Sequence, residues 1–395
     1  MVNLRRRSWL VLMLLFALVV PRATKAESPA KAAITPDSPQ VPAQLLLTFA
    51  AYGDIPYEIK LPNGRTDDQV LFEDIAPALR QRQDIPFIIN LGDLGRPEST
   101  CNDGWLRKTK VFWETKLVKP VFYTPGDNDW ADCDRLNLKV RQSEDGRLQH
   151  LRNIFFSRPK NVTPVWKLEQ VQAILARNPQ LNYPDTTLEA IRRVVAMDPS
   201  QFARDWHYET EPELPENAIW MRNGVLFVTL HYISTDNGRS EIYLDDPKKA
   251  LALVDERDRQ DKSWLNRAFE KAQRTNVKAV VVATQLDPFG PEKKQETSLA
   301  HCLNNPAYAG LCRQVETLSA ALGKPVLFLH GDTNAYCLDQ PFEKTKNIWR
   351  LNAPGDYKYI DASVIKVFPE DPTHPFQATG LLSGKPAPDV CDYSP

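Results

Sequence analysis

The chain contains 395 residues, of which 42% are hydrophobic and 25% charged, and its 49 basic side chains nearly balance its 50 acidic ones. This is the composition of a globular protein, and it excludes intrinsically disordered, collagen-like and coiled-coil classes. A protein that binds duplex nucleic acid usually has a basic stripe. The sequence shows none, so no nucleic acid duplex is expected as a partner.

The N-terminal segment has the pattern of a secretory signal peptide. Arginines at 5–7 precede a run of twelve apolar residues at 9–20, and small residues occupy positions −3 and −1 of a cleavage site after Ala26. A membrane anchor, the alternative, needs about 18 apolar residues. We therefore expect residues 1–26 to be removed and the Pro/Ala/Ser-rich residues 27–42 to form a flexible linker. The mature protein would be periplasmic or secreted, of bacterial origin, with no integral membrane contact.

Export changes the interpretation of the cysteines. The chain has six cysteines, an even number, and the expected compartment is oxidising. None of the cysteines forms a CxxC pair, so a thiolate zinc site is not expected. Fifteen connectivities are possible for six cysteines, and it stays open that one or more of the thiols are free. The favoured pairs are Cys302–Cys312, Cys337–Cys391 and, by remainder, Cys101–Cys133.

The first part of the mature chain alternates apolar strands with amphipathic helices. Strands are expected at 45–50, 86–91 and 120–123, and helices at 67–82 and 105–117. This alternation is typical of βαβ units, in which helices cover a largely parallel sheet. The sequence therefore predicts an α/β protein.

Residues 136–217 interrupt the alternation and are interpreted as a helical insertion that contains no convincing strand. Its amphipathic segments are at 148–156, 167–176 and 187–196. Strands then resume. They are expected at 218–221, 225–230, 278–283, 325–329, 347–351 and 362–368, with helices at 251–272 and 315–322.

Four of the predicted strands end in a glycine followed by an aspartate. The aspartates are Asp54, Asp93, Asp127 and Asp332. In an open α/β sheet, ligands bind at the carboxyl ends of the strands, so these side chains should converge. Converging carboxylates repel one another unless a cation or shared protons compensate, which predicts a metal site. A single Gly-Asp pair is more often a plain turn with a helix cap, but four at strand ends favour a site.

These blocks resemble the calcineurin-like metallophosphoesterase superfamily, which also contains purple acid phosphatases and many nucleotidases. Its D-x-H, G-D, G-N-H-D/E, isolated His and G-H-x-H blocks each follow a strand. The chain has Asp54-Ile55-Pro56, Gly92-Asp93, Gly126-Asp127-Asn128-Asp129, Gln285 and Gly331-Asp332-Thr333-Asn334. The resemblance covers about residues 45 to 335 and is to a divergent secreted bacterial branch. It implies an αββα sandwich for residues 43–395, with two packed mixed sheets flanked by helices and the helical insertion.

The chain departs from the superfamily at the histidines. Pro56 stands at the first ligand histidine, Asn128 at the catalytic histidine and Gln285 at the isolated one. Asp127 replaces the ligand asparagine, and the last block has no histidine at its ligand positions. The metal ligands that the resemblance implies are Asp54, Asp93, Asp127, Asp332 and Asn334, with Asp93 in the bridging position. This oxygen-rich set favours Mg²⁺ or Mn²⁺, with Ca²⁺ as an alternative, over Zn²⁺.

Other residues are candidates for catalysis and substrate binding. Asn128 takes the catalytic position, and His231 and His330 follow or end strands near the predicted rim, where either is a candidate general acid. The alternative is a hydrogen-bonded histidine at a strand end. Arg135 is a candidate for binding a substrate phosphate, and the alternative is a surface ion pair with a neighbouring aspartate. Asn237 is a candidate hydrogen-bond donor to a substrate oxyanion, and the alternative is a simple turn.

The expected function is that of a secreted, metal-dependent phosphoester hydrolase acting on a phosphorylated small molecule. One or two cations would activate a water molecule for attack on phosphorus. The alternative is a catalytically silent module that binds a phosphorylated or carbohydrate ligand on the same scaffold. Loss of the histidines supports this alternative, whereas the retained aspartates support the enzyme.

Overall fold

The structure, a computed structural model, describes residues 43–117, 119–156, 205–240, 242–290 and 298–394. The expected signal peptide, the linker and the helices at 167–176 and 187–196 lie outside this part of the chain. None of the helices that are described is long and apolar enough to span a membrane.

The first sheet has five strands in the order β12-β11-β1-β2-β3. β1 pairs in parallel with β2, and β2 with β3, whereas β11 pairs antiparallel with both β1 and β12. The sheet is therefore mixed, and the carboxyl ends of β1, β2 and β3 lie at one edge. The strands are β1 (Leu47–Tyr52), β2 (Ile88–Asn90), β3 (Val121–Tyr123), β11 (Ser363–Val367) and β12 (Phe376–Gly380).

The second sheet has seven strands in the order β4-β5-β6-β7-β8-β10-β9. β6, β7, β8 and β10 run parallel, and antiparallel strands complete the sheet on both sides. The strands are β4 (Glu209–Thr210), β5 (Ala218–Arg222), β6 (Val225–Thr229), β7 (Ala279–Ala283), β8 (Val326–His330), β9 (Cys337–Asp339) and β10 (Ile348–Asn352).

The two sheets pack against each other through a shared apolar core. Phe49 of β1 and Phe87, which directly precedes β2, meet Phe227 of the second sheet, with ring centroids 5.2 and 5.0 Å from that of Phe227. Phe122 stacks on Trp220 in the same layer, at 3.7 Å. Alternate residues of each strand enter this core, and the others form a second core on the outer face of each sheet.

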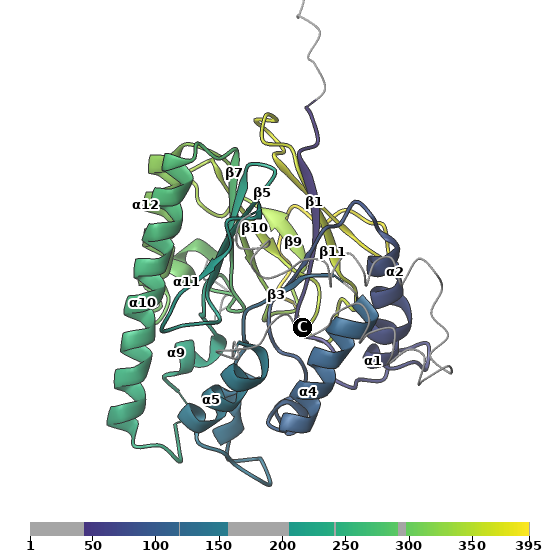
Figure 1. The fold of residues 1–395 in the computed structure, drawn as a ribbon, viewed down its shortest axis with the longest axis vertical. Coiled ribbons are helices and arrows are strands. Elements are labelled where there is room, and N and C mark those ends of the chain that lie inside the picture. The colour runs from purple at the N-terminus through teal and green to yellow at the C-terminus, as the bar shows by residue number, and fades with distance from the viewer. Residues whose placement is uncertain (1–42, 118, 157–204, 241, 291–297, 395) are drawn as a thin grey trace, which may run out of the picture. The chain divides into compact units, whose positions relative to one another are not determined.

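Helices cover both outer faces, so the layers are helix, sheet, sheet and helix. Figure 1 shows α10 and α12 along one side of the molecule and α1, α2 and α4 on the opposite side. π-Helical turns over Leu71–Ile75 and Trp113–Leu117 extend α1 and α4, and a short 3-10 turn spans Ala131–Asp134. The α-helices are α1 (Asp67–Val70), α2 (Ala76–Gln81), α3 (Pro97–Thr100), α4 (Asp103–Phe112), α5 (Glu144–Phe155), α9 (Ser234–Gly238), α10 (Pro247–Arg274), α11 (Ser298–Asn304) and α12 (Ala309–Leu322).

The mixed α/β architecture with two mixed sheets agrees with the sequence analysis. One correction concerns the insertion at 136–217, for which no strand was expected: its described part contains α5 and the short strand β4. β4 has two residues and pairs only with β5 at a sheet edge, so no hydrophobic alternation marks it in the sequence.

Three disulfides connect all six cysteines, as the favoured pairing predicted. They join Cys101 to Cys133, Cys302 to Cys312, and Cys337 to Cys391, with Cα–Cα distances of 5.5, 6.0 and 5.0 Å. Structural disulfides persist in oxidising compartments and are rare in the cytosol. The three bonds therefore fit a protein that is secreted.

Candidate functional site

The four aspartates that follow glycines lie on loops at the carboxyl ends of strands from both sheets. Asp54, Asp93 and Asp127 follow β1, β2 and β3, and Asp332 follows β8. The backbone N–H of Asp332 donates a hydrogen bond of 3.0 Å to Asp54 Oδ2, which joins the loops of the two sheets directly. Asp54, Asp93 and Asp127 are at most 4% exposed. The fold thus gathers the four side chains into one buried acidic region.

Asp93 is held by donors from two neighbouring loops. The Tyr57 hydroxyl donates to Asp93 Oδ2 at 2.7 Å, and the backbone N–H of Asn128 donates to Oδ1 at 3.2 Å. The Asn128 amide also donates to the Tyr57 hydroxyl oxygen at 3.4 Å. A side-chain amide does not titrate near neutral pH, so Asn128 positions Asp93 and Tyr57 and cannot replace a catalytic histidine as a general acid or base.

Asp127 and Asp332 are connected through one neutral side chain. Gln285 Nε2 donates to Asp127 Oδ1 at 3.3 Å and to Asp332 Oδ1 at 3.1 Å. Ser234 donates its hydroxyl hydrogen to the other oxygen of Asp127, and its backbone N–H donates to Gln285 Oε1 at 3.2 Å. Gln285 therefore links two of the aspartates as a hydrogen-bond donor.

A fifth aspartate, Asp356, joins the four and was missed by the sequence analysis. It follows Gly355 after β10, and its backbone N–H donates to the carbonyl oxygen of Asp54 at 3.1 Å. Burial and then the charge of Asp127 raise its pKa to about 6. The signal was available, because Gly355-Asp356 is a fifth Gly-Asp pair close behind a predicted strand. The five aspartates at 54, 93, 127, 332 and 356 are called the carboxylate cluster below.

Asp129 organises the loops around the cluster. Its carboxylate accepts backbone hydrogen bonds from Asp93, Leu94 and Gly126, at 3.1, 2.9 and 2.9 Å. The Tyr123 hydroxyl is a fourth donor, at 2.7 Å. Burial raises the pKa of Asp129 to about 6 although the backbone donors oppose the change. Asp129 thereby holds the loops after β2 and β3 together.

Two glycines are required by the closeness of the carboxylates. A Cβ atom on Gly126 would overlap Asp93 Oδ1, and one on Gly331 would overlap Asp54 Oδ2. The glycine that precedes an aspartate on one loop therefore makes room for an aspartate of another loop. The repeated Gly-Asp pairs have a steric cause as well as a turn-forming one.

Burial and mutual repulsion raise the pKa of several cluster members. Burial is the largest cause for Asp54, Asp93 and Asp332, and the charges of neighbouring cluster members add to it. Desolvation and nearby like charges both disfavour a carboxylate. Without a compensating cation, these carboxyl groups therefore hold their protons more tightly than exposed aspartates do.

The donor set fits a hard divalent cation. The side chains offer carboxylate oxygens, and Asp54 Oδ1 is buried without a hydrogen-bond partner among the described residues. In the same part of the chain, only Cys337, Asp339 and Cys391 bring three potential ligand atoms within 4.8 Å of one another, and these cysteines form a disulfide. The cluster carboxylates are spaced more widely. Carboxylate oxygens are the ligands that hard cations such as Mg²⁺ and Ca²⁺ bind in proteins.

His231 is a buried structural residue, which does not fit the expected role of general acid. Its Nδ1 lies 2.7 Å from Glu216 Oε1, and its Nε2 accepts a hydrogen bond from Trp130 Nε1 at 3.1 Å. Burial lowers its pKa to about 4, so the ring is neutral at pH 7. Both ring nitrogens are occupied by protein partners, and neither is available to a substrate.

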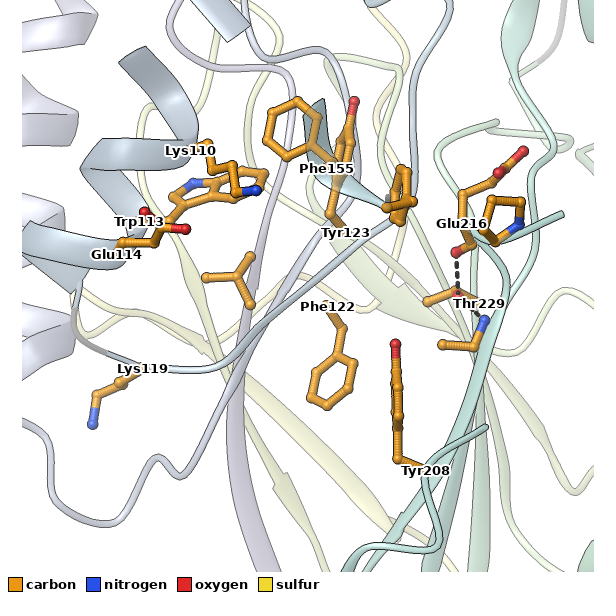
Figure 2. Close-up of a pocket in the computed structure, with 14 residues that line it drawn as sticks. Lys110, Trp113, Glu114, Lys119, Phe122, Tyr123, Phe155, Tyr208, Glu216 and Thr229 are labelled. Atoms are coloured by element: carbon orange, nitrogen blue, oxygen red, sulfur yellow. Dashed lines mark hydrogen bonds between the residues drawn. The ribbon is translucent and has the colours of Figure 1, made fainter. Parts of the chain in front are cut away.

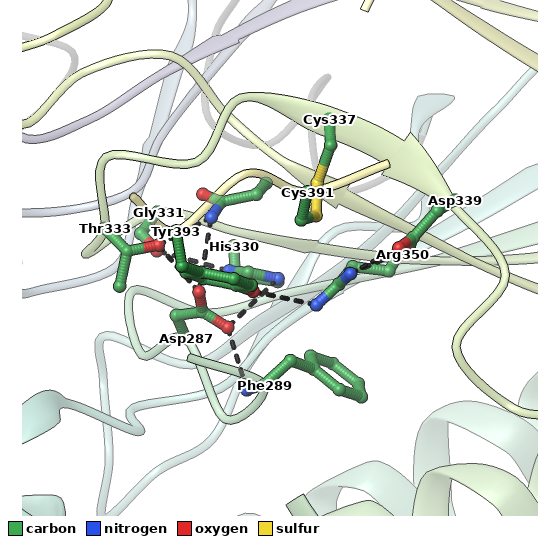
Figure 3. Close-up of a disulfide and its surroundings, with 11 residues drawn as sticks. Asp287, Phe289, His330, Gly331, Thr333, Cys337, Asp339, Arg350, Cys391 and Tyr393 are labelled. Carbon is green, nitrogen blue, oxygen red and sulfur yellow. Dashed lines mark hydrogen bonds and ion pairs between the residues drawn. A yellow bond between two sulfur atoms is a disulfide. The ribbon is translucent and has the colours of Figure 1, made fainter. Parts of the chain in front are cut away.

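His330 faces away from the cluster as well. Leu327 and Leu329 of β8 enter the core between the sheets, so alternation turns His330 toward the outer face beside Phe289. Its Nε2 lies 3.6 Å from Asp287 Oδ1 (Figure 3). The ring is completely buried. Burial lowers its pKa. The expected role of general acid therefore does not fit His330 either.

The two substrate-binding candidates have structural partners. Arg135 forms an ion pair of 2.6 Å with Asp132, which was the alternative interpretation. Asn237 is completely buried: its Oδ1 accepts the backbone N–H of Ile233 at 3.1 Å, and its amide donates to Asp258. Asn334, the fifth ligand candidate, is half-buried, and its Oδ1 has no hydrogen-bond partner among the described residues.

A separate cavity of about 260 Å³ lies at the edge of the sandwich (Figure 2). Aromatic side chains form much of its wall, with two lysines and two glutamates among the other lining residues. No member of the carboxylate cluster lines this cavity. The cluster instead reaches the surface through the half-buried Asp332 and Asp356.

No protein-family model matches the chain, and no curated protein is significantly similar to it.

Proposed function

We propose that the protein is an exported, divalent-cation-dependent phosphoester hydrolase of the metallophosphoesterase type. The observation that carries this proposal is the convergence of five aspartates, from strand-end loops of both sheets, on one largely buried site. The helix–sheet–sheet–helix layers and the order of the Gly-Asp loops along the chain support it. The three disulfides support export.

An anionic substrate could not approach these carboxylates without a cation, because like charges repel. Asp54, Asp93, Asp127 and Asp332 would hold Mg²⁺ or Mn²⁺, with Asn334 as a neutral oxygen donor. Bound there, the cation would polarise the phosphate and lower the pKa of a water molecule so that it becomes a nucleophile. Tyr57 and the backbone of Asn128 orient Asp93, and Ser234 and Gln285 orient Asp127 for this task.

A catalytically silent binding module is the second candidate. It is favoured by the absence of any histidine from the hydrogen-bonded partners of the cluster in the described part of the chain. Neutral donors from Tyr57, Ser234 and Gln285 already satisfy several carboxylate oxygens. Such a protein would bind a cation together with a phosphorylated or carbohydrate ligand, without turnover.

Metal analysis and hydrolysis assays on the purified mature protein separate the two candidates. The enzyme should bind Mn²⁺ or Mg²⁺ and cleave an aryl phosphate monoester or diester only with the cation present. Asp93→Asn should remove both properties, since loss of a ligand costs at least about 10–100-fold in metal affinity. Asp236→Asn changes an exposed aspartate and is the matched control, with a milder effect. Cation binding without hydrolysis would leave the silent module, and absence of cation binding would contradict both.

A further inference from the structure

An exposed tyrosine stands beside the buried cluster. Tyr357 directly follows Asp356 and is 49% exposed. Its ring centroid lies 4.8 Å from that of Tyr57, at a tilt of 44°, and the Tyr57 hydroxyl donates to Asp93. A ligand that touches the open part of the Tyr357 ring is therefore separated from the cluster by a single side chain.

The backbone that presents Tyr357 is strained. Asp356 and Tyr357 both have positive φ angles, of 48° and 68°. This conformation is unfavourable for a non-glycine residue. Asp356 gains a backbone hydrogen bond to the Asp54 carbonyl oxygen in this conformation, whereas the half-exposed Tyr357 gains little from burial. Unfavourable backbone geometry of this kind is concentrated where side chains bind ligands.

An arginine lies at the same rim. Arg96 follows the Asp93 loop at the N-cap position of α3, and its guanidinium carbon is 5.8 Å from the centroid of the Tyr357 ring. The Arg96 side chain is exposed and forms no ion pair with any residue that the structure describes. A guanidinium that pairs with no carboxylate and lies beside an open aromatic ring can attract an anion while the ring contacts a planar group.

We propose that Tyr357 and Arg96 bind the organic part of the substrate, and that the preferred substrates are phosphoesters of a planar aromatic group. This inference rests on the proposed function. Tyr357 stacks on the aryl or base-like group, and Arg96 pairs with a negatively charged oxygen of the same molecule. Because stacking on an aromatic side chain contributes about 1–3 kcal/mol, its loss corresponds to roughly a 5-fold or larger loss of affinity.

The first experiment compares phenyl phosphate with ethyl phosphate, in the presence of Mn²⁺. Tyr357→Ala should raise KM for phenyl phosphate roughly 5-fold or more and leave kcat and the ethyl ester nearly unchanged. Tyr357→Phe should restore the phenyl KM. Arg96→Ala should raise KM for both esters, since charge attraction does not depend on the organic group. Tyr243→Ala is the matched control, because Tyr243 is 46% exposed and has Arg141 5.4 Å from its ring but contacts no cluster member.

Equal effects of Tyr357→Ala on both esters, or an equal effect of Tyr243→Ala, would overturn the inference. If the wild-type protein cleaves neither ester, the proposed function fails, and the inference is tested separately by calorimetric binding of phenylphosphonate and ethylphosphonate with Mn²⁺. Weaker binding of phenylphosphonate alone by Tyr357→Ala would then support an aromatic-ligand site on a silent module. Unchanged binding of both phosphonates by this variant, or no binding to the wild type, would refute it.

Discussion

The position of Asp93 depends on the absence of a Cβ atom at Gly126, in the loop after β3. Gly126 packs so closely against Asp93 that a methyl group would meet both its carboxylate and its backbone nitrogen. Asp129 holds the two loops at this distance through hydrogen bonds to their N–H groups. Since both loops are fixed, a larger residue at position 126 has to displace the carboxylate.

Gly126→Ala should therefore damage the site more than the fold. We expect a loss of about 1–3 kcal/mol in stability from overpacking, and a loss of about 10–100-fold in Mn²⁺ affinity, measured by calorimetry. Gly146→Ala is the control: it lies in α5, where an added Cβ has ordinary contacts of 3.6 and 3.8 Å with Ser143. That change should be neutral or stabilising by up to about 1 kcal/mol. Unaltered Mn²⁺ binding by Gly126→Ala would contradict the steric argument.

Asp261 is a buried carboxyl group remote from the cluster. Its Oδ1 accepts hydrogen bonds from Asn217 Nδ2 at 2.6 Å and from the backbone N–H of His231 at 3.1 Å. Its Oδ2 is buried without a partner among the described residues. Desolvation raises its pKa to about 7. The folded protein consequently keeps a proton on Asp261 at pH values where the unfolded chain has lost it.

This pKa shift predicts how Asp261→Asn changes the pH dependence of stability. The raised pKa makes Asp261 favour the folded state most at low pH, and this contribution is lost as the pH rises from about 4 to about 7. The amide of the variant does not titrate. The thermal midpoint of the wild type relative to the variant should therefore fall between pH 5 and pH 8. A constant difference between the two proteins across this range would contradict the shift.

Among the larger elements, the C-terminal tail depends on a single covalent link. Cys391 joins the tail to β9 at Cys337, across 54 residues of sequence. Two residues further on, the Tyr393 hydroxyl accepts a hydrogen bond of 2.9 Å from Arg350 of β10, as Figure 3 shows. Tyr393 lies over Asp287, the partner of His330, so the tail closes the outer side of this buried polar group.

Removing this disulfide should destabilise the protein more than removing Cys302–Cys312, whose sequence separation is only 10. Loop-closure entropy predicts a contribution of about 4 kcal/mol for the longer loop and about 3 kcal/mol for the shorter one. The double serine variants at 337/391 and 302/312 can be compared by their thermal midpoints. A smaller decrease for the 337/391 variant would show that strain or residual unfolded structure outweighs chain entropy.

The elements best predicted from the sequence are the buried central strands. β1, β2, β6, β7 and β8 are continuous apolar runs, and such runs identify strands that are covered on both faces. The edge strands β4, β9 and β12 were missed. They are short or half-exposed, and their pairing partners, rather than their own composition, make them strands.

The histidine roles could not be predicted for a related reason. Which side of a strand a residue faces depends on register, and a change of one residue reverses it. His330 ends β8 beside the cluster in sequence, but the alternation set by Leu329 turns it to the outer face. The Nδ1 atom of His231 contacts the Glu216 carboxylate, and no local sequence pattern connects these two residues. By contrast, a glycine before an aspartate at a strand end marks each member of the cluster in the sequence. The same pattern at Gly355-Asp356 would have identified Asp356 as well.

At the scale of the whole molecule, the two sheets together concentrate more negative charge at one site than either sheet would alone. The loops after β1, β2 and β3 supply three carboxylates, and the loops after β8 and β10 of the second sheet supply two more. Packing of the sheets through their apolar core therefore forces Asp332 and Asp356 against Asp54. Folding without a cation has to overcome this repulsion, whereas a cation converts it into attraction.

Stability should consequently respond to cation and pH together. The pKa values of Asp54, Asp93 and Asp332 are raised, so without metal these groups favour the folded state at low pH and oppose it as the pH rises through their folded pKa values. The chelated protein should thus melt at a lower temperature at pH 8 than at pH 5.

Mn²⁺ should raise the thermal midpoint more at pH 8 than at pH 5. At about 100 times the Kd measured at pH 8, Mn²⁺ should add about 2.7 kcal/mol, roughly 5 °C, at that pH. The same concentration should add less at pH 5, where protons compete for the ligands. Asp93→Asn should lose most of this response. A Mn²⁺ response that is absent at pH 8, or equally large at both pH values, would contradict a cation-linked cluster.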